Sequence, residues 1–158
     1  MAVVGPGDAD ASACAAAEEV GGLIAKRDGV VVCGGLGGVM AAAARGAAAA
    51  GGLSLGIVPG VDRSQACSDL TLVVASGLGE MRNALVVQAS DAVIAVGAGW
   101  GALSEVALAV RMGKPVAAVG FWTIADGGRE VDGVSSARSP TEAVELAFAG
   151  LATATARG

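Results

Sequence analysis

The clearest indication of the fold is the stretch Val30-Val31-Val32-Cys33-Gly34-Gly35-Leu36-Gly37-Gly38-Val39-Met40. Its three valines and cysteine form a short β-branched run, which is typical of a strand buried on both faces. The glycines that follow permit a tight turn, and the alanines after Met40 favour a helix. This stretch therefore predicts a strand, a glycine-rich loop and a helix in direct succession.

The same succession recurs on both sides of this stretch. Besides the strand at 30–33, we predict strands at 2–4, 53–58, 70–74, 92–96 and 115–119, helices at about 10–26, 40–50, 79–88, 102–112 and 140–149, and loops at 61–69 and 121–139. Strands that alternate with helices in this way are typical of a parallel sheet. We therefore expect one α/β domain over residues 1–158, a doubly wound Rossmann-like sheet of about six or seven strands with helices on both faces.

Composition and charge exclude several classes of function. Hydrophobic residues make up 54% of the chain and charged residues 16%, which excludes intrinsic disorder. The formal net charge of −5 argues against nucleic acid or an anionic membrane surface as the main partner. The chain has no His, so histidine catalysis and histidine metal ligation are excluded, and we expect no metal site.

The cysteines and the apolar segments indicate the compartment. Cys14, Cys33 and Cys67 are widely spaced and form no CxxC pair, as in proteins of a reducing compartment. The start of the chain lacks the basic region of a signal peptide, and Gly, Pro or a charge interrupts each apolar stretch before it could span a bilayer. We therefore expect a cytoplasmic protein without a membrane partner.

Glycine-rich loops at the carboxyl ends of the strands form the candidate site, because ligands of doubly wound sheets bind beyond these ends. Residues 34–40 lead from a strand into a helix N-terminus, where free backbone N–H groups and the helix dipole favour phosphate. Residues 97–105 repeat this arrangement on a later strand. A tight turn with close helix–sheet packing would explain the same glycines.

Residues 97–102 also match the relaxed GxGxxG/A fingerprint of dinucleotide-binding proteins. The match follows a late strand, and no Asp or Glu lies about twenty residues further on to bind a ribose. NAD is therefore not the ligand that we expect.

Charged and aromatic side chains flank these loops. Glu105 lies near the start of a predicted helix. Its role is that of a base, that of an acceptor for a sugar hydroxyl, or only that of a carboxylate that stabilises the helix dipole. Arg82 and Asn83 open another helix, where a bound anion would explain the arginine and a solvated side chain is the alternative. Trp100 and Trp122 either stack on a planar ring, plug the end of the sheet or form an oligomer contact.

Two blocks of sequence resemble a known superfamily. The first block comprises residues 33–40, 45–47, 51–52 and 56–60, and the second comprises 81–83, 90–94, 97–105 and 113–115. In this order the chain resembles, over nearly its whole length, the LOG-like Rossmann superfamily, long mislabelled as lysine decarboxylases. The short length and the Met-Arg-Asn block look closest to the molybdenum-cofactor-carrier-like branch.

The resemblance implies a homodimer or homotetramer and a site for a phosphorylated small molecule, such as an AMP-like nucleotide or a molybdopterin-type cofactor. Phosphoribohydrolases of the superfamily cut nucleoside 5′-monophosphates with an Arg and with the Glu of a Pro-Gly-Gly-x-Gly-Thr-x-x-Glu loop, to which Arg82 and Glu105 are the nearest matches. Here Val96, Ala98 and Ala102 replace the Pro, the second Gly and the Thr, and the His-x-Arg-Lys pattern is absent. These departures favour binding over hydrolysis, and lysine decarboxylation is not expected.

Three hypotheses of function follow. The first is a binding protein for a phosphorylated small molecule, the second a phosphoribohydrolase with Glu105 and Arg82 as catalytic residues, and the third an oligomeric interaction module with a vestigial site. The predicted ligand-binding residues are Gly5, Gly7, Gly34, Gly35, Gly37, Gly38, Met40, Pro59, Arg82, Asn83, Gly97, Gly99, Trp100, Gly101, Ala102 and Glu105.

Overall fold

The computed structural model describes residues 1–155, so residues 156–158 of the predicted domain lie outside it. Seven strands form one sheet in the order β4-β3-β2-β1-β5-β6-β9, and every neighbouring pair is parallel. The strands are β1 (Ala2–Val4), β2 (Val31–Cys33), β3 (Ser54–Val58), β4 (Leu72–Ala75), β5 (Val93–Val96), β6 (Val116–Val119) and β9 (Ser135–Ala137). The predicted doubly wound α/β fold is confirmed.

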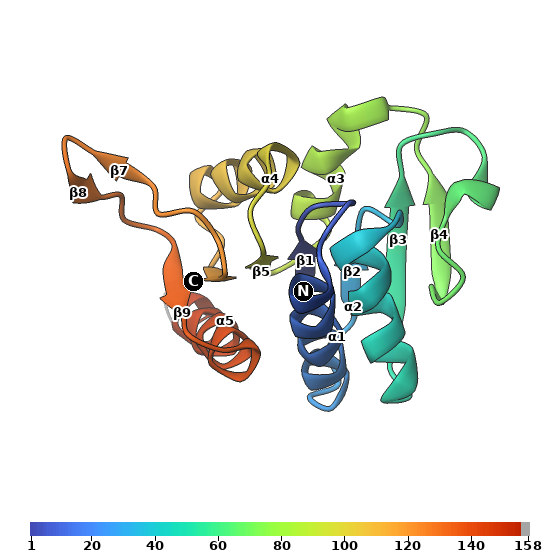
Figure 1. The fold of residues 1–158 in the computed structure, drawn as a ribbon, viewed down its shortest axis with the longest axis horizontal. Helices are drawn as coiled ribbons and strands as arrows, with labels where there is room; N and C mark the ends of the chain where they lie inside the picture. Colours follow the sequence, from blue (N-terminus) through green and yellow to red (C-terminus); the bar gives the residue numbers. More distant parts are fainter. Residues whose placement is uncertain (156–158) are drawn as a thin grey trace.

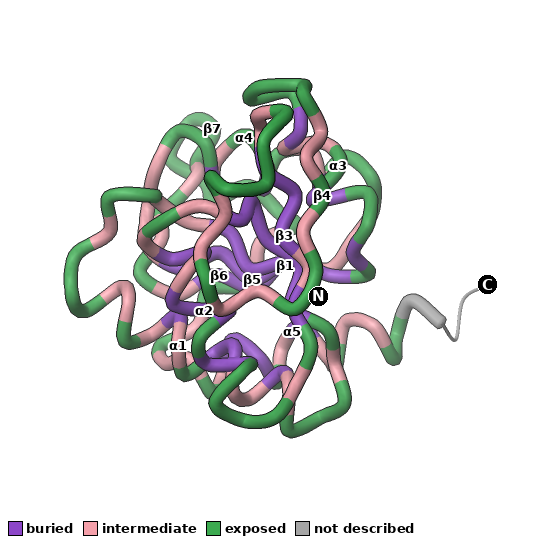
Figure 2. Tube along the Cα trace, turned by 90° about the vertical axis from the view of Figure 1, so that its right-hand side faces the viewer, coloured by how far each residue is buried: buried purple, intermediate pink, exposed green. Residues whose placement is uncertain are grey.

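Helices cover both faces of the sheet (Figure 1). On the lower face in this view lie α1 (Ala11–Ala25), α2 (Gly38–Ala49) and α5 (Pro140–Thr155), and on the upper face lie α3 (Asn83–Gln88) and α4 (Trp100–Arg111). β1, β2 and β5 are buried at every residue, as expected for central strands of a parallel sheet. Figure 2 shows β1 and β5 among the buried segments, with exposed loops around them.

Small residues allow α1 and α2 to pack closely. Gly21 of α1 faces the carbonyl of Ala43, and Gly46 of α2 faces the carbonyl of Glu18, with no space for a Cβ at either glycine. Close packing of this kind increases the dispersion contacts between the two helices. It explains why Ala and Gly dominate these helices.

Four segments differ from the prediction. α5 extends to Thr155 and not only to residue 149, and the predicted loop 61–69 contains the 3-10 turn Arg63–Gln65. The predicted helix 79–88 begins with the 3-10 turn Gly79–Arg82, in which the N–H of Met81 donates to the carbonyl of Leu78, and becomes α-helical only in α3. Gly79 has a φ of +57°, and its N–H donates to the carbonyl of Pro59. The predicted loop 121–139 contains β9, which pairs with β6, and a small antiparallel hairpin of β7 (Ala125–Asp126) and β8 (Arg129–Glu130).

The chain changes its direction across the sheet between β1 and β5. β2, β3 and β4 lie on one side of β1, and β5, β6 and β9 lie on the other. The loops that follow β1 and β5 therefore diverge, and this point is where doubly wound sheets usually bind ligands. The predicted site residues Gly5 and Gly97 begin these two loops.

Two features are absent from residues 1–155. No helix in this range is long and apolar enough to cross a membrane. The same residues contain no group of three or more Cys, Asp or Glu side chains arranged to hold a metal ion.

Candidate functional site

Arg82 is buried at the carboxyl edge of the sheet, with 8% of its surface exposed. The turn Gly79–Arg82 carries it there, and the hydrogen bond from Gly79 to the carbonyl of Pro59 ties that turn to the end of β3. Pro59, a predicted site residue, therefore contributes its backbone carbonyl to the position of this turn. The alternative prediction of a solvated arginine is wrong.

Gly34 provides the space that the guanidinium occupies. A Cβ on Gly34 would lie 2.7 Å from Cζ of Arg82 and 2.7 Å from Sδ of Met40. Met40 is itself buried in the first turn of α2, and its methyl carbon would lie 3.6 Å from a Cβ on Gly7. The structure thus brings Gly7, Gly34, Met40 and Arg82 together.

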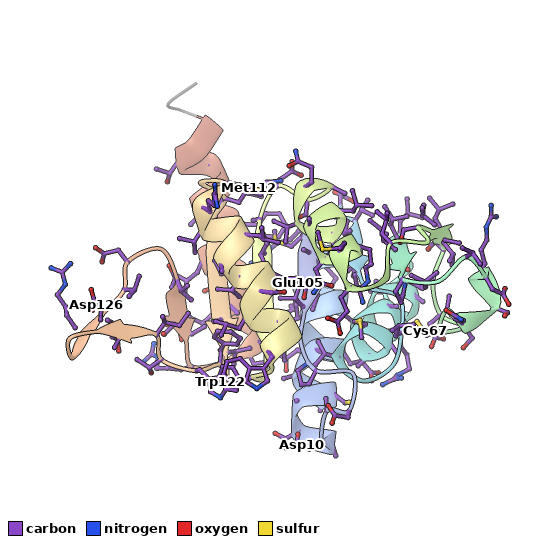
Figure 3. The ribbon with its side chains drawn as sticks, turned by 90° about the horizontal axis from the view of Figure 1, so that it is seen from above. Asp10, Cys67, Glu105, Met112, Trp122 and Asp126 are labelled. Carbon is purple, nitrogen blue, oxygen red and sulfur yellow. The ribbon has the colours of Figure 1, made fainter. Side chains whose placement is uncertain are left out.

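Glu105 approaches the same guanidinium from α4, and in the view of Figure 3 it lies between α4 and α3. Its Oε1 is 3.7 Å from Nη1 of Arg82, and only 6% of the residue is exposed. Burial raises the pKa of Glu105 to about 7, although the charge of Arg82 acts to lower it. The charge of this carboxyl group therefore changes near neutral pH.

Cys33 is a neighbouring titratable group on β2. Burial raises the pKa of its thiol to about 12, so that the thiol stays protonated at neutral pH. Its Sγ lies 3.7 Å from the carbonyl of Met40. Cys33 therefore contributes packing and no charge to the site.

Asn83 and Ser104 connect Arg82 to the first turn of α4. Nη1 of Arg82 donates to Oδ1 of Asn83, and Nδ2 of Asn83 donates to Oγ of Ser104 at 3.1 Å. Oγ of Ser104 donates in turn to the carbonyl of Gly101 at 2.7 Å. Ser104 is not among the residues predicted from the sequence, where its signal was a hydroxyl side chain directly before Glu105 in an apolar helix.

One donor of Arg82 is unsatisfied. Its Nε is buried and has no hydrogen-bond partner in the part of the chain that the structure describes. Leaving a buried polar group without a partner costs about 1–3 kcal/mol, and more for a charged group. Such a cost in the middle of a glycine-rich edge marks the guanidinium as a candidate for ligand binding.

Two helices start at this edge without a side-chain cap. Gly37 precedes α2 and Gly99 precedes α4, and neither can offer a side-chain acceptor to the first backbone N–H groups. At α2 the N–H of Val39 donates to the carbonyl of Pro6, so the loop after β1 occupies this end. At α4 the space around Gly101 is open, so an anion can approach the positive end of the helix dipole.

Most of the other predicted glycines serve packing. Gly38 has a φ of +58° and lies against the backbone of the loop after β1, and Gly35 has a φ of +74° and lies against Val58. Gly5 and Gly37 also have close neighbours, and Gly97 has a φ of +66°, whereas a Cβ on Gly99 would meet nothing nearer than 3.6 Å. Tight packing or a positive φ therefore accounts for Gly5, Gly35, Gly37, Gly38 and Gly97 without a ligand, and neither accounts for Gly99.

Trp100 and Trp122 form an exposed aromatic pair beside the start of α4. Their ring centroids are 4.9 Å apart with the planes at 60°, and Phe121 lies next to Trp122 with 6.1 Å between ring centroids. Trp100 is 79% exposed, so it does not plug the end of the sheet. The pair leaves aromatic surface free for a planar ring.

A groove of about 530 Å³ lies at the switch point, on the side of the sheet that α1 covers. Pro6, Asp8 and Asp10 line it together with Gly97 and Ala98. Arg82 and Glu105 lie on the other side, where α3 and α4 cover the sheet. The carboxyl edge therefore has an acidic groove at one place and the buried pair of Arg82 and Glu105 at another.

A comparison with family models identifies the relatives of this chain. The model described as the SLOG cluster4 family matches residues 1–144. The chain belongs to the SLOG cluster4 family. This result confirms the resemblance to the LOG-like Rossmann superfamily.

Individual relatives of this SLOG cluster4 chain agree with that assignment. An uncharacterized protein of Archaeoglobus fulgidus is 42% identical over 120 residues, which are 75% of this chain and 78% of the relative. The structure of a molybdenum cofactor binding protein from Rippkaea orientalis has a TM-score of 0.84 and 34% identity over 94% of each chain. The Moco carrier protein of Chlamydomonas reinhardtii has a TM-score of 0.84 and 32% identity over 96% of each chain.

Gly34→Ala in this SLOG cluster4 protein is expected to lower the free energy of unfolding by about 1–3 kcal/mol, the usual cost of overpacking. The new methyl group would overlap the guanidinium of Arg82 and Sδ of Met40. Urea unfolding at pH 6 measures the change. Gly101→Ala is the matched control: its Cβ would meet nothing within 4 Å, so alanine should stabilise α4 by about 0.5–1 kcal/mol. Equal stability of the two variants would contradict the packing described for Gly34.

Proposed function

We propose that this SLOG cluster4 protein binds a phosphorylated small molecule, with a pterin-type cofactor as the first candidate and an AMP-like nucleoside monophosphate as the second. The observation that carries the proposal is a buried arginine, with an unsatisfied Nε, at the edge where α4 starts without a cap. The two structural relatives named for the molybdenum cofactor support the pterin type.

In the proposed complex, Arg82 and the first turn of α4 hold the phosphate. The guanidinium offers several donors in one plane, which suits phosphate oxygens. Trp100, Gly101 and Ala102 supply backbone N–H groups that have no partner within the helix. Ala102 lacks the hydroxyl of the superfamily's threonine, and the loss of one such contact costs about 0.5–1.5 kcal/mol, too little to abolish binding.

The aromatic pair and Glu105 complete the proposed site. Trp100 and Trp122 would cover the planar ring of the ligand. A Glu105 that carries a proton leaves the positive charge of Arg82 uncompensated, which favours an anion beside it. No metal ion is part of the proposal.

Calorimetric titration with AMP and adenosine tests the phosphate part of the proposal. The two probes share the base and the ribose, so their difference reports the phosphate alone. We expect AMP to bind at least about tenfold more tightly, since hydrogen bonds to charged groups contribute about 1.5–3 kcal/mol. The same comparison between molybdopterin and its dephosphorylated form extends the test to the pterin type. Equal affinities within both pairs would overturn the proposal.

The near-neutral pKa of Glu105 favours a second candidate, a nucleoside 5′-monophosphate phosphoribohydrolase. A buried carboxyl group of this kind suits general acid–base catalysis at neutral pH. The protein is incubated with AMP or N6-substituted AMP, and chromatography detects free base. Our proposal of a binding protein predicts intact nucleotide. Base release by the wild type that Glu105→Gln abolishes would instead assign the hydrolase function.

The expected homodimer or homotetramer also remains a proposal. Leu72 and Val74 of the edge strand β4 are exposed on the sheet face that they share with Leu55 and Ile57. α3 has six residues and does not cover β4. A second copy of the chain on this face would remove these side chains from water, which favours association. The vestigial interaction module would use the same face without any ligand.

A further inference from the structure

Arg82 and Glu105 do not form a hydrogen-bonded ion pair. The shortest ion-pair distance between Arg82 and Glu105 is 3.7 Å, from Nη1 to Oε1. A charge-assisted hydrogen bond between such groups is about 2.7–2.9 Å long. The same Nη1 donates instead to Oδ1 of Asn83, which is a neutral acceptor. The arrangement around Arg82 therefore favours the neutral amide oxygen of Asn83 over the carboxyl group of Glu105 as the acceptor.

The hydroxyl of Ser104 holds the Asn83 amide at its Nδ2 end, while Arg82 binds the Oδ1 end. Ser104 uses its only proton on the carbonyl of Gly101 and accepts a hydrogen bond from Nδ2 of Asn83. Because Nδ2 is held on this side, Oδ1 of Asn83 faces Arg82. An amide turned the other way would place two donors against each other at Arg82 and two acceptors against each other at Ser104.

We propose that Ser104 is a positioning residue that, through Asn83, holds the Arg82 guanidinium apart from Glu105 and so keeps it available to an anionic ligand. This inference rests on the proposed phosphate-binding function. Ser104 itself is exposed, and the proposal includes no contact between Ser104 and the ligand. It acts on the guanidinium of Arg82 through two hydrogen bonds, from Asn83 to Ser104 and from Arg82 to Asn83.

Removal of the hydroxyl has two consequences. In Ser104→Ala the Asn83 side chain loses the hydrogen bond that anchors it beside Arg82, and Arg82 moves to Glu105, the stronger acceptor. A closed ion pair stabilises the ionised carboxyl group, so the pKa of Glu105 falls from about 7 towards its usual range. An incoming phosphate must then break this pair, so its affinity falls. Cys33, the titratable neighbour on β2, keeps its proton because burial raises its pKa to about 12.

Two measurements on the full chain test the proposal. Calorimetric titration with AMP at pH 7 should show about fivefold weaker binding for Ser104→Ala, and Ser104→Thr, which keeps the hydroxyl, should restore the wild-type affinity. Carbon-detected NMR of the glutamate carboxyl groups, without ligand, should show the lower pKa of Glu105 in Ser104→Ala and the wild-type value in Ser104→Thr.

Thr153→Ala is the matched control, because it removes a hydroxyl that also bonds to a carbonyl of its own helix, in α5. It should leave the AMP affinity and the Glu105 titration as in the wild type. An unchanged Glu105 titration in Ser104→Ala, or losses that Ser104→Thr fails to restore, would overturn the proposal. Absence of AMP binding by the wild type would count against the phosphate site alone, and the NMR titration would still decide the role of Ser104.

Discussion

Arg82→Ala is expected to weaken AMP binding by about 10- to 100-fold, the effect of losing hydrogen bonds to a charged group of about 1.5–3 kcal/mol. Arg82 is the buried cation at the edge where α4 begins, and its guanidinium faces the start of that helix through Asn83 and Ser104. The titration is performed at pH 6, where Glu105 holds its proton and is not left as a buried, unpaired charge.

Two further variants make this result interpretable. Arg82→Gln keeps most of the side-chain volume and removes the charge, so it should weaken binding similarly even if Arg82→Ala unfolds. Arg111→Ala removes an exposed arginine from the opposite end of α4 and should bind AMP like the wild type. If both Arg82 variants bind AMP with wild-type affinity, the phosphate does not lie at Arg82.

The free energy of unfolding of the wild type is expected to fall as the pH rises from about 5 to about 8. Burial raises the pKa of Glu105 in the folded protein from 4.5 to about 7, so between these values the folded state holds a proton that the unfolded state has released. Stability therefore decreases with rising pH over this range. Each pKa unit corresponds to about 1.4 kcal/mol, so the contribution of Glu105 is on the order of 3 kcal/mol.

Urea unfolding at several pH values measures this dependence. Glu105→Gln cannot ionise, so its stability curve should lack the decrease that the wild type shows. Glu145→Gln removes an exposed carboxylate of α5 and should keep the wild-type decrease. Parallel curves for the wild type and Glu105→Gln would show that Glu105 ionises in the folded protein as it does in water.

The fold could be predicted from the sequence because its central strands are short β-branched runs followed by glycines. The run Val31–Cys33 and the segment Val93–Val96 are buried on both faces, which makes their sequences continuously apolar. β9 was missed because Ser135–Ala137 has neither this apolarity nor a regular alternation. Its strand geometry comes from pairing with β6 at the edge of the sheet, which is a tertiary interaction.

The candidate site could be predicted only in part. The sequence placed Arg82 and Glu105 at the same edge of the sheet, but their contact depends on how α3 packs against α4. Glycines that bind a ligand and glycines that allow close packing look alike in a sequence, and only the surroundings of Gly34, Gly38 and Gly101 distinguish them. Ser104 acts through hydrogen bonds that no spacing rule describes.

A crystal structure of the protein with AMP or a molybdopterin-type cofactor is the most direct test of the proposed binding site. We predict that the phosphate lies within hydrogen-bond distance of the Arg82 guanidinium and of backbone N–H groups in the first turn of α4, with the ring near Trp100. A phosphate in the groove beside Asp8 and Asp10, or no ordered ligand at saturating concentration, would contradict this account.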